Sequence, residues 1–274
     1  MQDTNDYYRI PRESLGQGAR IPVIAAGPAA EVFALAAREI LDVIESNNAR
    51  GRRSVIIVPV GPVGQYPLFV DLVNARGTDL RNVWFFNMDE YLGPDGGWID
   101  PAHKLSFRGF MNRQVYGRIR PDILMPESQR IFPDPADPGA TDALLESLGG
   151  ADACFGGIGI NGHIAFNEPE DVSAAEFLNR PTRVLDIAPE TLTSNAIGDL
   201  GGAIEAMPRR CVTIGMRAIM GARMVRLYCF RDWHRAVVRR AAYGEPSARF
   251  PASLLQGHPD ARITVADTVA EAAC

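Results

Sequence analysis

Apolar residues between positions 29 and 48 recur at the spacing of an amphipathic helix. They would share one face of that helix: Val32, Phe33, Ala36, Ile40, Val43 and Ile44. Pro28 precedes the stretch, and proline suits the first turn of a helix. Residues 54–58, Ser-Val-Ile-Ile-Val, form a continuous apolar run instead. Such a run is typical of a strand that is buried on both faces.

Similar apolar runs and helical stretches alternate along the rest of the chain. Further strands are predicted at residues 82–86, 152–155, 183–187, 211–214, 225–230 and 262–265. Further helices are predicted at residues 68–76, 105–116, 141–148 and 233–243. This alternation predicts an α/β fold, with a Rossmann-like, mostly parallel sheet that carries helices on both faces. We expect a polar N-terminal extension at residues 1–20 and a single domain over residues 21–274.

Length and composition allow a large core and argue against several partners. The chain has 274 residues, of which 46% are hydrophobic, so it can bury a substantial interior. No apolar run reaches the length that crosses a membrane, and the first residues lack the pattern of a signal peptide. We therefore expect a cytoplasmic protein without a membrane partner. The formal net charge of −5 argues against nucleic acid as a partner.

The four cysteines are predicted to be reduced thiols. They are widely spaced and form no Cys-x-x-Cys pair: Cys154, Cys211, Cys229 and Cys274. No set of histidines, cysteines or carboxylates has the spacing of metal ligands, so we do not expect a metal.

Three loops follow predicted strands, at residues 59–64, 87–93 and 156–168. In open parallel sheets, ligands bind beyond the carboxyl ends of the strands. We therefore expect these loops to converge on one small-molecule pocket.

The third loop combines a glycine-rich backbone with an imidazole and a carboxylate. Gly157, Gly159 and Gly162 allow tight turns and let a ligand approach main-chain N–H groups. His163 and Glu168 follow, and such a pair can be an acid/base group with its orienting partner. A buried core histidine is the alternative. The glycine spacing also fits the dinucleotide fingerprint, but a proline follows too soon for the required helix and arginines stand where an acidic residue is needed.

In the second loop, Asp89 and Glu90 lie just after a predicted strand. Adjacent carboxylates in such a place often cap the N–H groups of the next element. A carboxylate there can also serve as a general base. The residues alone leave both interpretations open.

Two segments resemble the signatures of the glucosamine-6-phosphate deaminase family. They are Phe-Asn-Met-Asp-Glu-Tyr-Leu-Gly at 86–93 and Gly-Gly-Ile-Gly-Ile-Asn-Gly-His-Ile-Ala-Phe-Asn-Glu-Pro at 156–169. A similar flanking pattern extends over residues 22–270. The resemblance implies the fold of that family and a cofactor-independent, isomerising deaminase of the hydrolase class. Such an enzyme converts a 2-amino-2-deoxy aldose to a ketose and releases ammonia.

The resemblance also implies roles for individual residues. Asp89 would move a proton from C2 to C1 of the open-chain sugar, and His163 would open the sugar ring. Glu168 would orient the imidazole together with Asn161, which stands where the family has an aspartate. The residues expected to bind substrate are Gly61, Glu90, Gly157, Gly159, Gly162 and His234.

Two other functions remain open. The 6-phosphogluconolactonases, which hydrolyse a sugar lactone, share the fold and a Gly-His loop. A non-catalytic sugar sensor would need the same pocket. In each case the expected partner is a small molecule, an amino sugar or a sugar phosphate. The sequence leaves open whether the chain forms a homo-oligomer.

The residues that hold the 6-phosphate in the family are missing here. Residues 59–64, Pro-Val-Gly-Pro-Val-Gly, lack the hydroxyl side chains of the family loop. Ile197 stands at the family's arginine position, and His234 stands near its lysine position. Either the substrate is not phosphorylated or another arginine compensates, and the candidates are Arg108, Arg183 and Arg235. Residues 185–186 lack the basic and hydroxyl side chains of the family's allosteric segment, so we do not expect regulation by an acetylated sugar phosphate.

Overall fold

The computed structural model describes residues 6–274 and contains two sheets. The larger sheet has seven strands, and all its neighbouring strands are parallel. Their order is β1 (Val23–Ala25), β10 (Ala261–Val265), β9 (Val225–Cys229), β6 (Ala153–Gly156), β2 (Ser54–Val58), β3 (Val83–Asn87) and β5 (Arg130–Ile131). Every residue of β2 is buried, as its continuous apolar run predicted.

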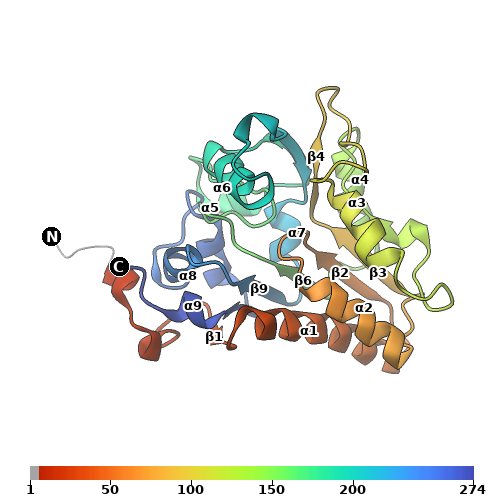
Figure 1. The fold of residues 1–274 in the computed structure, drawn as a ribbon, viewed down its shortest axis with the longest axis horizontal. Helices are drawn as coiled ribbons and strands as arrows, with labels where there is room; N and C mark the ends of the chain where they lie inside the picture. Colours follow the sequence, from red (N-terminus) through yellow and green to blue (C-terminus); the bar gives the residue numbers. More distant parts are fainter. Residues whose placement is uncertain (1–5) are drawn as a thin grey trace.

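Helices lie on either side of this sheet (Figure 1). They are α1 (Ala29–Ala49), α2 (Gln65–Arg76), α3 (Phe107–Met111), α4 (Pro138–Ser147), α5 (Ala174–Leu178), α6 (Pro189–Asp199), α7 (Met216–Met220), α8 (His234–Tyr243) and α9 (Asp267–Ala270). In the view of Figure 1, α1 and α2 lie below the strands, and α5 and α6 lie above them. The α/β fold with a mostly parallel sheet is therefore confirmed.

Short 3₁₀ segments complete the chain, at Asp6–Arg9, Arg12–Ser14, Glu127–Gln129, Ile204–Ala206 and Pro251–Gly257. A π-helical turn, Asn112–Tyr116, continues α3, so the helix predicted at 105–116 is present but changes its hydrogen-bonding pattern halfway. Within residues 6–274, no helix has the length and apolar character that crossing a membrane requires.

A second sheet corrects the predicted topology. It is antiparallel, with strand order β4 (Asp89–Leu92), β8 (Arg210–Thr213) and β7 (Arg183–Asp186). The strands predicted at 183–187 and 211–214 exist, but they pair here and not in the parallel sheet. The segment 87–93 is largely strand rather than loop, because β4 pairs with β8.

The N-terminal extension is attached to the domain over its described part. The guanidinium of Arg239 on α8 donates to the carbonyl of Ile10, at 3.0 Å from Nε and 2.7 Å from Nη2. Arg12 forms ion pairs with Asp267 and Glu271. Residues 6–20 of the predicted extension therefore pack against the domain, and residues 1–5 lie outside the described part.

Candidate active site

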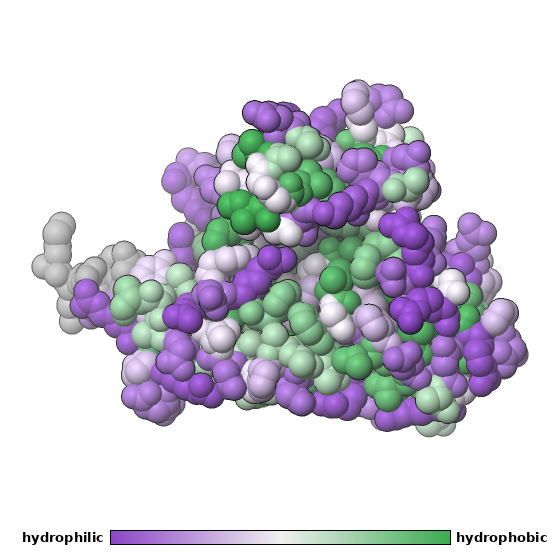
Figure 2. Space-filling view, in the orientation of Figure 1, coloured by the Kyte–Doolittle hydropathy of each residue, from purple (hydrophilic) through white to green (hydrophobic). Residues whose placement is uncertain are grey.

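A cavity of about 490 Å³ lies at the carboxyl ends of the central strands. It is lined by parts of all three loops that the sequence singled out, including Val60, Gly61, Asp89, Gly157 and His163. Figure 2 shows the hollow between the part of the molecule that carries α6 and the large sheet. The predicted convergence on one pocket is therefore observed.

His163 is oriented through one nitrogen of its imidazole. Nδ1 lies 2.8 Å from Oδ1 of Asn161 and 3.1 Å from Oγ1 of Thr191. The Asn161 amide nitrogen donates in turn to Oε2 of Glu168, at 2.8 Å. Because an amide oxygen can only accept, Nδ1 of the neutral ring carries the proton. Nε2 is left with a lone pair, and His163 lines the cavity.

Glu168 anchors this arrangement as an ionised carboxylate. Burial opposes its ionisation, but hydrogen bonds and charge interactions from His163, with hydrogen bonds from Asn161 and Thr191, outweigh burial and lower its pKa. Thr191 donates its hydroxyl proton to Oε2 at 3.0 Å. The sequence did not single out Thr191, which lies on α6 and reaches the site only through the fold.

The position of the His163 ring depends on Gly159. A Cβ at residue 159 would lie 2.0 Å from Cε1 of His163 and 2.1 Å from Nε2. Only glycine therefore leaves room for the imidazole. Gly162 is required for a different reason, which is its backbone conformation: its φ of +87° favours glycine. Gly162 does not line the cavity. It is a turn residue packed against Phe250 and not, as predicted, a substrate-binding one.

Asp89 is a buried carboxylate at the cavity wall, with 6% of its surface exposed. Burial, and then the charge of Glu90, raise its pKa well above the usual value for an aspartate. Among residues 6–274, no hydrogen-bond donor contacts its side chain. A desolvated carboxylate without protein partners is suited to take a proton from a bound substrate.

Glu90 corrects another prediction, because it does not line the cavity. Successive strand residues face opposite sides, so Asp89 faces the cavity and Glu90 faces α3. Its carboxylate, fully buried, accepts from Ser106 Oγ at 2.9 Å and from the N–H groups of Tyr91, Phe107 and Arg108, at 2.9, 3.0 and 2.8 Å. The capping interpretation is right for Glu90 and does not apply to Asp89.

His234 lines the cavity but cannot supply a positive charge there. Its Nδ1 accepts from the N–H groups of Phe230 and Arg231, at 3.2 and 2.9 Å. Its Nε2 therefore carries the proton and donates to the carbonyl of Ile158, at 3.0 Å. Burial lowers the pKa of His234 to about 4. These hydrogen bonds link the start of α8 to the glycine loop, and the substrate contact expected of His234 stays a prediction.

The three arginines considered as phosphate ligands are engaged elsewhere, and none lines the cavity. Arg108 lies over the Trp98 ring, 4.2 Å from its centroid. Arg235 donates to the carbonyl of Thr268 at 2.7 Å. The two fixed cations that do line the cavity are Lys104 and Arg231. No sequence signal pointed to either residue.

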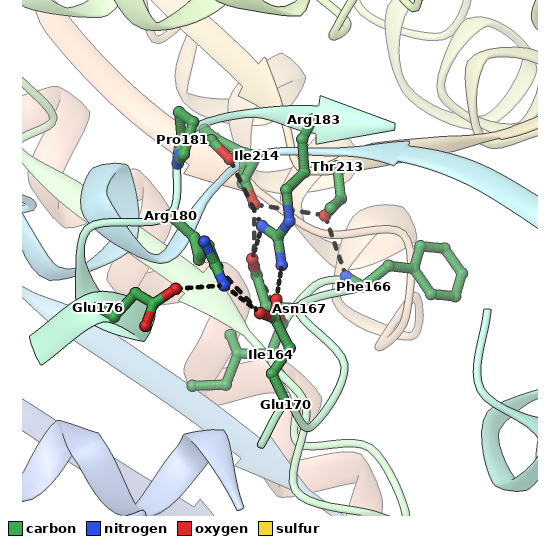
Figure 3. A network of polar contacts seen from close by, with 10 residues as sticks. All are labelled: Ile164, Phe166, Asn167, Glu170, Glu176, Arg180, Pro181, Arg183, Thr213 and Ile214. Atoms are coloured by element: carbon green, nitrogen blue, oxygen red, sulfur yellow. Dashed lines mark hydrogen bonds and ion pairs between the residues drawn. The ribbon is translucent and has the colours of Figure 1, made fainter. Parts of the chain in front are cut away.

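Arg183 belongs instead to a polar network that holds the end of the glycine loop (Figure 3). It donates to Oδ1 of Asn167 at 2.7 Å and to Oε1 of Glu170 at 3.0 Å. Asn167 donates to the carbonyl of Ile214 at 2.9 Å. The network ties the segment after Glu168 to strands β7 and β8 of the small sheet.

Within residues 6–274, no group of three or more His, Cys, Asp or Glu side chains is placed to hold a metal ion. Two side chains with acid/base chemistry instead face a shared cavity: the carboxylate of Asp89 and the imidazole of His163. A desolvated carboxylate with an oriented imidazole, at the strand ends of an α/β sheet, is typical of the acid/base site of an enzyme.

Comparison with known proteins identifies the family. No family model matches the chain. The glucosamine-6-phosphate deaminase of Staphylococcus haemolyticus is 31% identical over 208 residues, which cover 74% of this chain and 81% of that protein. The glucosamine-6-phosphate deaminase of a Geobacillus species is 33% identical over 207 residues, covering 73% and 76%. The chain therefore belongs to the glucosamine-6-phosphate deaminase family.

Solved structures agree with this assignment. A monomeric glucosamine-6-phosphate deaminase superimposes with a TM-score of 0.79 and 25% identity, covering 90% of this chain and 98% of the other. The 6-phosphogluconolactonase of Trypanosoma cruzi superimposes with a TM-score of 0.66 and 16% identity, covering 90% and 95%. The second likeness reflects the shared fold.

Proposed function

We propose that this protein is an amino-sugar deaminase that isomerises a 2-amino-2-deoxy aldose to a ketose and releases ammonia. The observation that carries the proposal is the pair Asp89 and His163, which face one cavity in a member of this family. The reaction requires a base for carbon-bound protons and a separate group for the ring hydroxyl. Asp89 is a buried carboxylate, which suits the removal of a carbon-bound proton. His163 is oriented through its Nδ1, which suits the transfer of a hydroxyl proton by its other nitrogen.

His163 is assigned to ring opening. Its Nε2 takes the proton of the anomeric hydroxyl and returns it to the ring oxygen, so that the C1–O5 bond breaks and the aldehyde forms. Asn161 and Thr191 hold the Nδ1 proton and so keep the Nε2 lone pair at the cavity. The family's aspartate is an amide here, and Glu168 is the one carboxylate that supports a charged ring in this network.

Asp89 is assigned to the carbon chemistry. It takes the proton from C2, and the electron pair forms a double bond between C1 and C2. A proton of the ammonium group moves to the C1 oxygen, and Asp89 returns its proton to C1. The double bond then lies between C2 and nitrogen, water adds at C2, and ammonia leaves. No electrons are exchanged with an outside acceptor, so the reaction as written needs no redox cofactor.

The test measures ammonia and ketose from purified protein with glucosamine, galactosamine, mannosamine and their 6-phosphates. Stoichiometric ammonia and ketose from at least one substrate support the proposal, and Asp89→Asn protein is the inactive control. Hydrolysis of 6-phosphogluconolactone without ammonia release from any amino sugar would identify a lactonase. Tight sugar binding without any turnover would identify a sensor. The cytoplasmic location and the oligomeric state remain predictions.

A further inference from the structure

The cavity has a positively charged side that the family resemblance did not predict. Lys104 precedes α3 and Arg231 precedes α8, so the two residues come from distant parts of the chain. Both line the same cavity as Asp89 and His163. Both are exposed at its mouth.

The two side chains converge on one turn of α6. Lys104 Nζ donates to the carbonyl of Asp199. A Cβ added to Gly198 would lie 3.2 Å from Nη1 of Arg231 and 3.7 Å from Nη2. Residues 198 and 199 are adjacent, so their Cα atoms are about 3.8 Å apart. The ammonium and the guanidinium therefore flank the same end of the helix, and glycine at 198 makes room for the guanidinium.

Neither cation is neutralised by an ion pair. Asp199 also lines the cavity, but among the residues that the structure describes neither its carboxylate nor any other forms an ion pair with Lys104 or Arg231. Arg231 lies near the ring of Phe230, at 5.7 Å from its centroid, and Lys104 binds only a carbonyl. Arg180 and Arg183, by contrast, are both paired with Glu170. Lys104 and Arg231 thus have N–H groups that remain available to a ligand.

The 59–64 loop offers an anion no charged or hydroxyl side chain. Val60 and Val63 of the 59–64 loop line the cavity with apolar side chains, and Pro62 has no N–H to offer. Ile197, at the family's arginine position, is 67% exposed. An anionic group on the substrate would therefore be stabilised at the α6 side and not at the loop.

We propose that Lys104 and Arg231 form an anion subsite that binds the phosphate of a hexosamine 6-phosphate. This inference rests on the proposed function for the identity of the sugar. It relocates the phosphate contacts from the 59–64 loop to the mouth of the cavity next to α6. Because the subsite is exposed, its contribution to affinity falls as ionic strength rises.

The test compares kcat/KM for glucosamine 6-phosphate and for glucosamine in the wild type, Lys104→Gln and Arg231→Gln. We expect the wild type to prefer the phosphosugar by at least about tenfold, as charge-assisted bonds to phosphate allow. Each variant should remove most of this preference, because kcat/KM for the phosphosugar should fall more than kcat/KM for glucosamine. Arg38→Gln, on the exposed side of α1 and away from the cavity, is the matched control.

Direct binding separates this inference from the proposed function. Titration calorimetry with glucosamine 6-phosphate should give a dissociation constant that weakens by about tenfold in each cavity variant and not in Arg38→Gln. If no sugar releases ammonia but binding shows this pattern, the deaminase proposal fails and the subsite stands. An equal preference in all four proteins, or the same affinity in all four, overturns the subsite.

Discussion

Asp89 and Glu90 show how far neighbouring carboxylates can differ. Both lie on β4, but strand geometry directs them to opposite sides. Glu90 is surrounded by N–H and O–H donors, whereas no donor among residues 6–274 contacts Asp89. At the scale of single residues, hydrogen bonding separates a structural carboxylate from the one proposed as the base.

Replacing Asp89 should separate activity from stability. Asp89→Asn removes the proposed base, so kcat should fall at least about a hundredfold. The folded-state pKa of Asp89 is raised by burial and by Glu90, so the stability of the fold is greatest with the group protonated and falls as pH rises through the raised pKa. The neutral amide should therefore give a higher Tm than the wild type at about pH 8, with the difference shrinking toward about pH 4.

Glu90→Gln is the matched control for that experiment. One acceptor oxygen becomes an NH₂ group that faces N–H donors, so the free energy of unfolding should fall by about 1–3 kcal/mol. The two adjacent substitutions should thus move Tm in opposite directions. Equal losses of stability in Asp89→Asn and Glu90→Gln would contradict the different hydrogen-bond environments assigned to the two carboxylates. A kcat above about a tenth of wild type in Asp89→Asn would exclude Asp89 as the base.

Restoring the family's aspartate at position 161 should destabilise this protein. The amide nitrogen of Asn161 donates to Glu168 at 2.8 Å, so Asn161→Asp would place two carboxylates in contact. Their repulsion raises the pKa of the pair, and the associated stability is lost as pH rises. Thermal unfolding should show a deficit against wild type that is larger at about pH 8 than at about pH 5.

The double variant Asn161→Asp with Glu168→Gln tests the cause. It restores one carboxylate and one amide in exchanged positions, so most of the stability at about pH 8 should return. If the double variant is no better than Asn161→Asp alone, charge repulsion is not the reason.

At the scale of elements, the glycine loop after β6 positions the imidazole. In Gly159→Ala the new Cβ would overlap the His163 ring, 2.0 Å from Cε1, so the ring must move. Displacement of a reacting group by about 1 Å can reduce the rate about a hundredfold, and we expect a loss of kcat of that order. Circular dichroism should show an intact fold.

Gly257→Ala is the control for this effect, because no atom lies within 4 Å of the added Cβ. Its kcat should equal that of the wild type. Wild-type kcat in Gly159→Ala would mean that His163 does not need its observed position.

The small sheet should stabilise the end of that loop through Arg183. Lysine has one ammonium and cannot bind Asn167 and Glu170 together as the guanidinium does. Arg183→Lys should therefore lower the free energy of unfolding by about 1–3 kcal/mol, measured by urea denaturation, and should reduce kcat. Arg180→Lys, which loses more exposed pairs with Glu170 and Glu176, should cost less than about 1 kcal/mol. Equal effects of both changes would show that the network does not depend on Arg183.

At the scale of the whole molecule, Arg239 joins the two ends of the described chain. Its buried guanidinium donates to the carbonyls of Ile10, Val269 and Ala270. Arg239→Met leaves these acceptors without their donor, so the free energy of unfolding should fall by about 1–3 kcal/mol. Limited proteolysis should then cut within residues 6–20 faster than in the wild type.

Arg240→Met, at the next position of α8, provides the comparison. Arg240 lies over the Phe250 ring, 4.3 Å from its centroid, and its loss should cost less than about 1 kcal/mol. Proteolysis of residues 6–20 at the same rate in both variants would show that Arg239 does not hold this segment.

Local sequence patterns predicted the elements that have a continuous apolar run or a regular helical spacing of apolar residues. The strands β2, β3, β6, β9 and β10 and the helix α1 were found near their observed bounds, because continuous apolar runs and helical spacing report burial directly. The glycine loop was located because its turn and its close approach to His163 need residues without side chains. The sequence did not predict three strands or four helices, which are β1, β4, β5, α5, α6, α7 and α9. All of them except α6 have five residues or fewer, and α6 has a weak apolar pattern.

The sequence by itself therefore determined the α/β class, the shared pocket and the residues proposed to carry its chemistry. Only the tertiary structure decided which sheet each strand joins, because the pairing of β4 and β7 with β8 is a contact between distant segments. It also decided the roles of Glu90 and His234, whose hydrogen bonds come from other elements. Lys104 and Arg231 each lie against the last turn of α6, and no local sequence pattern indicates that these distant residues share one cavity.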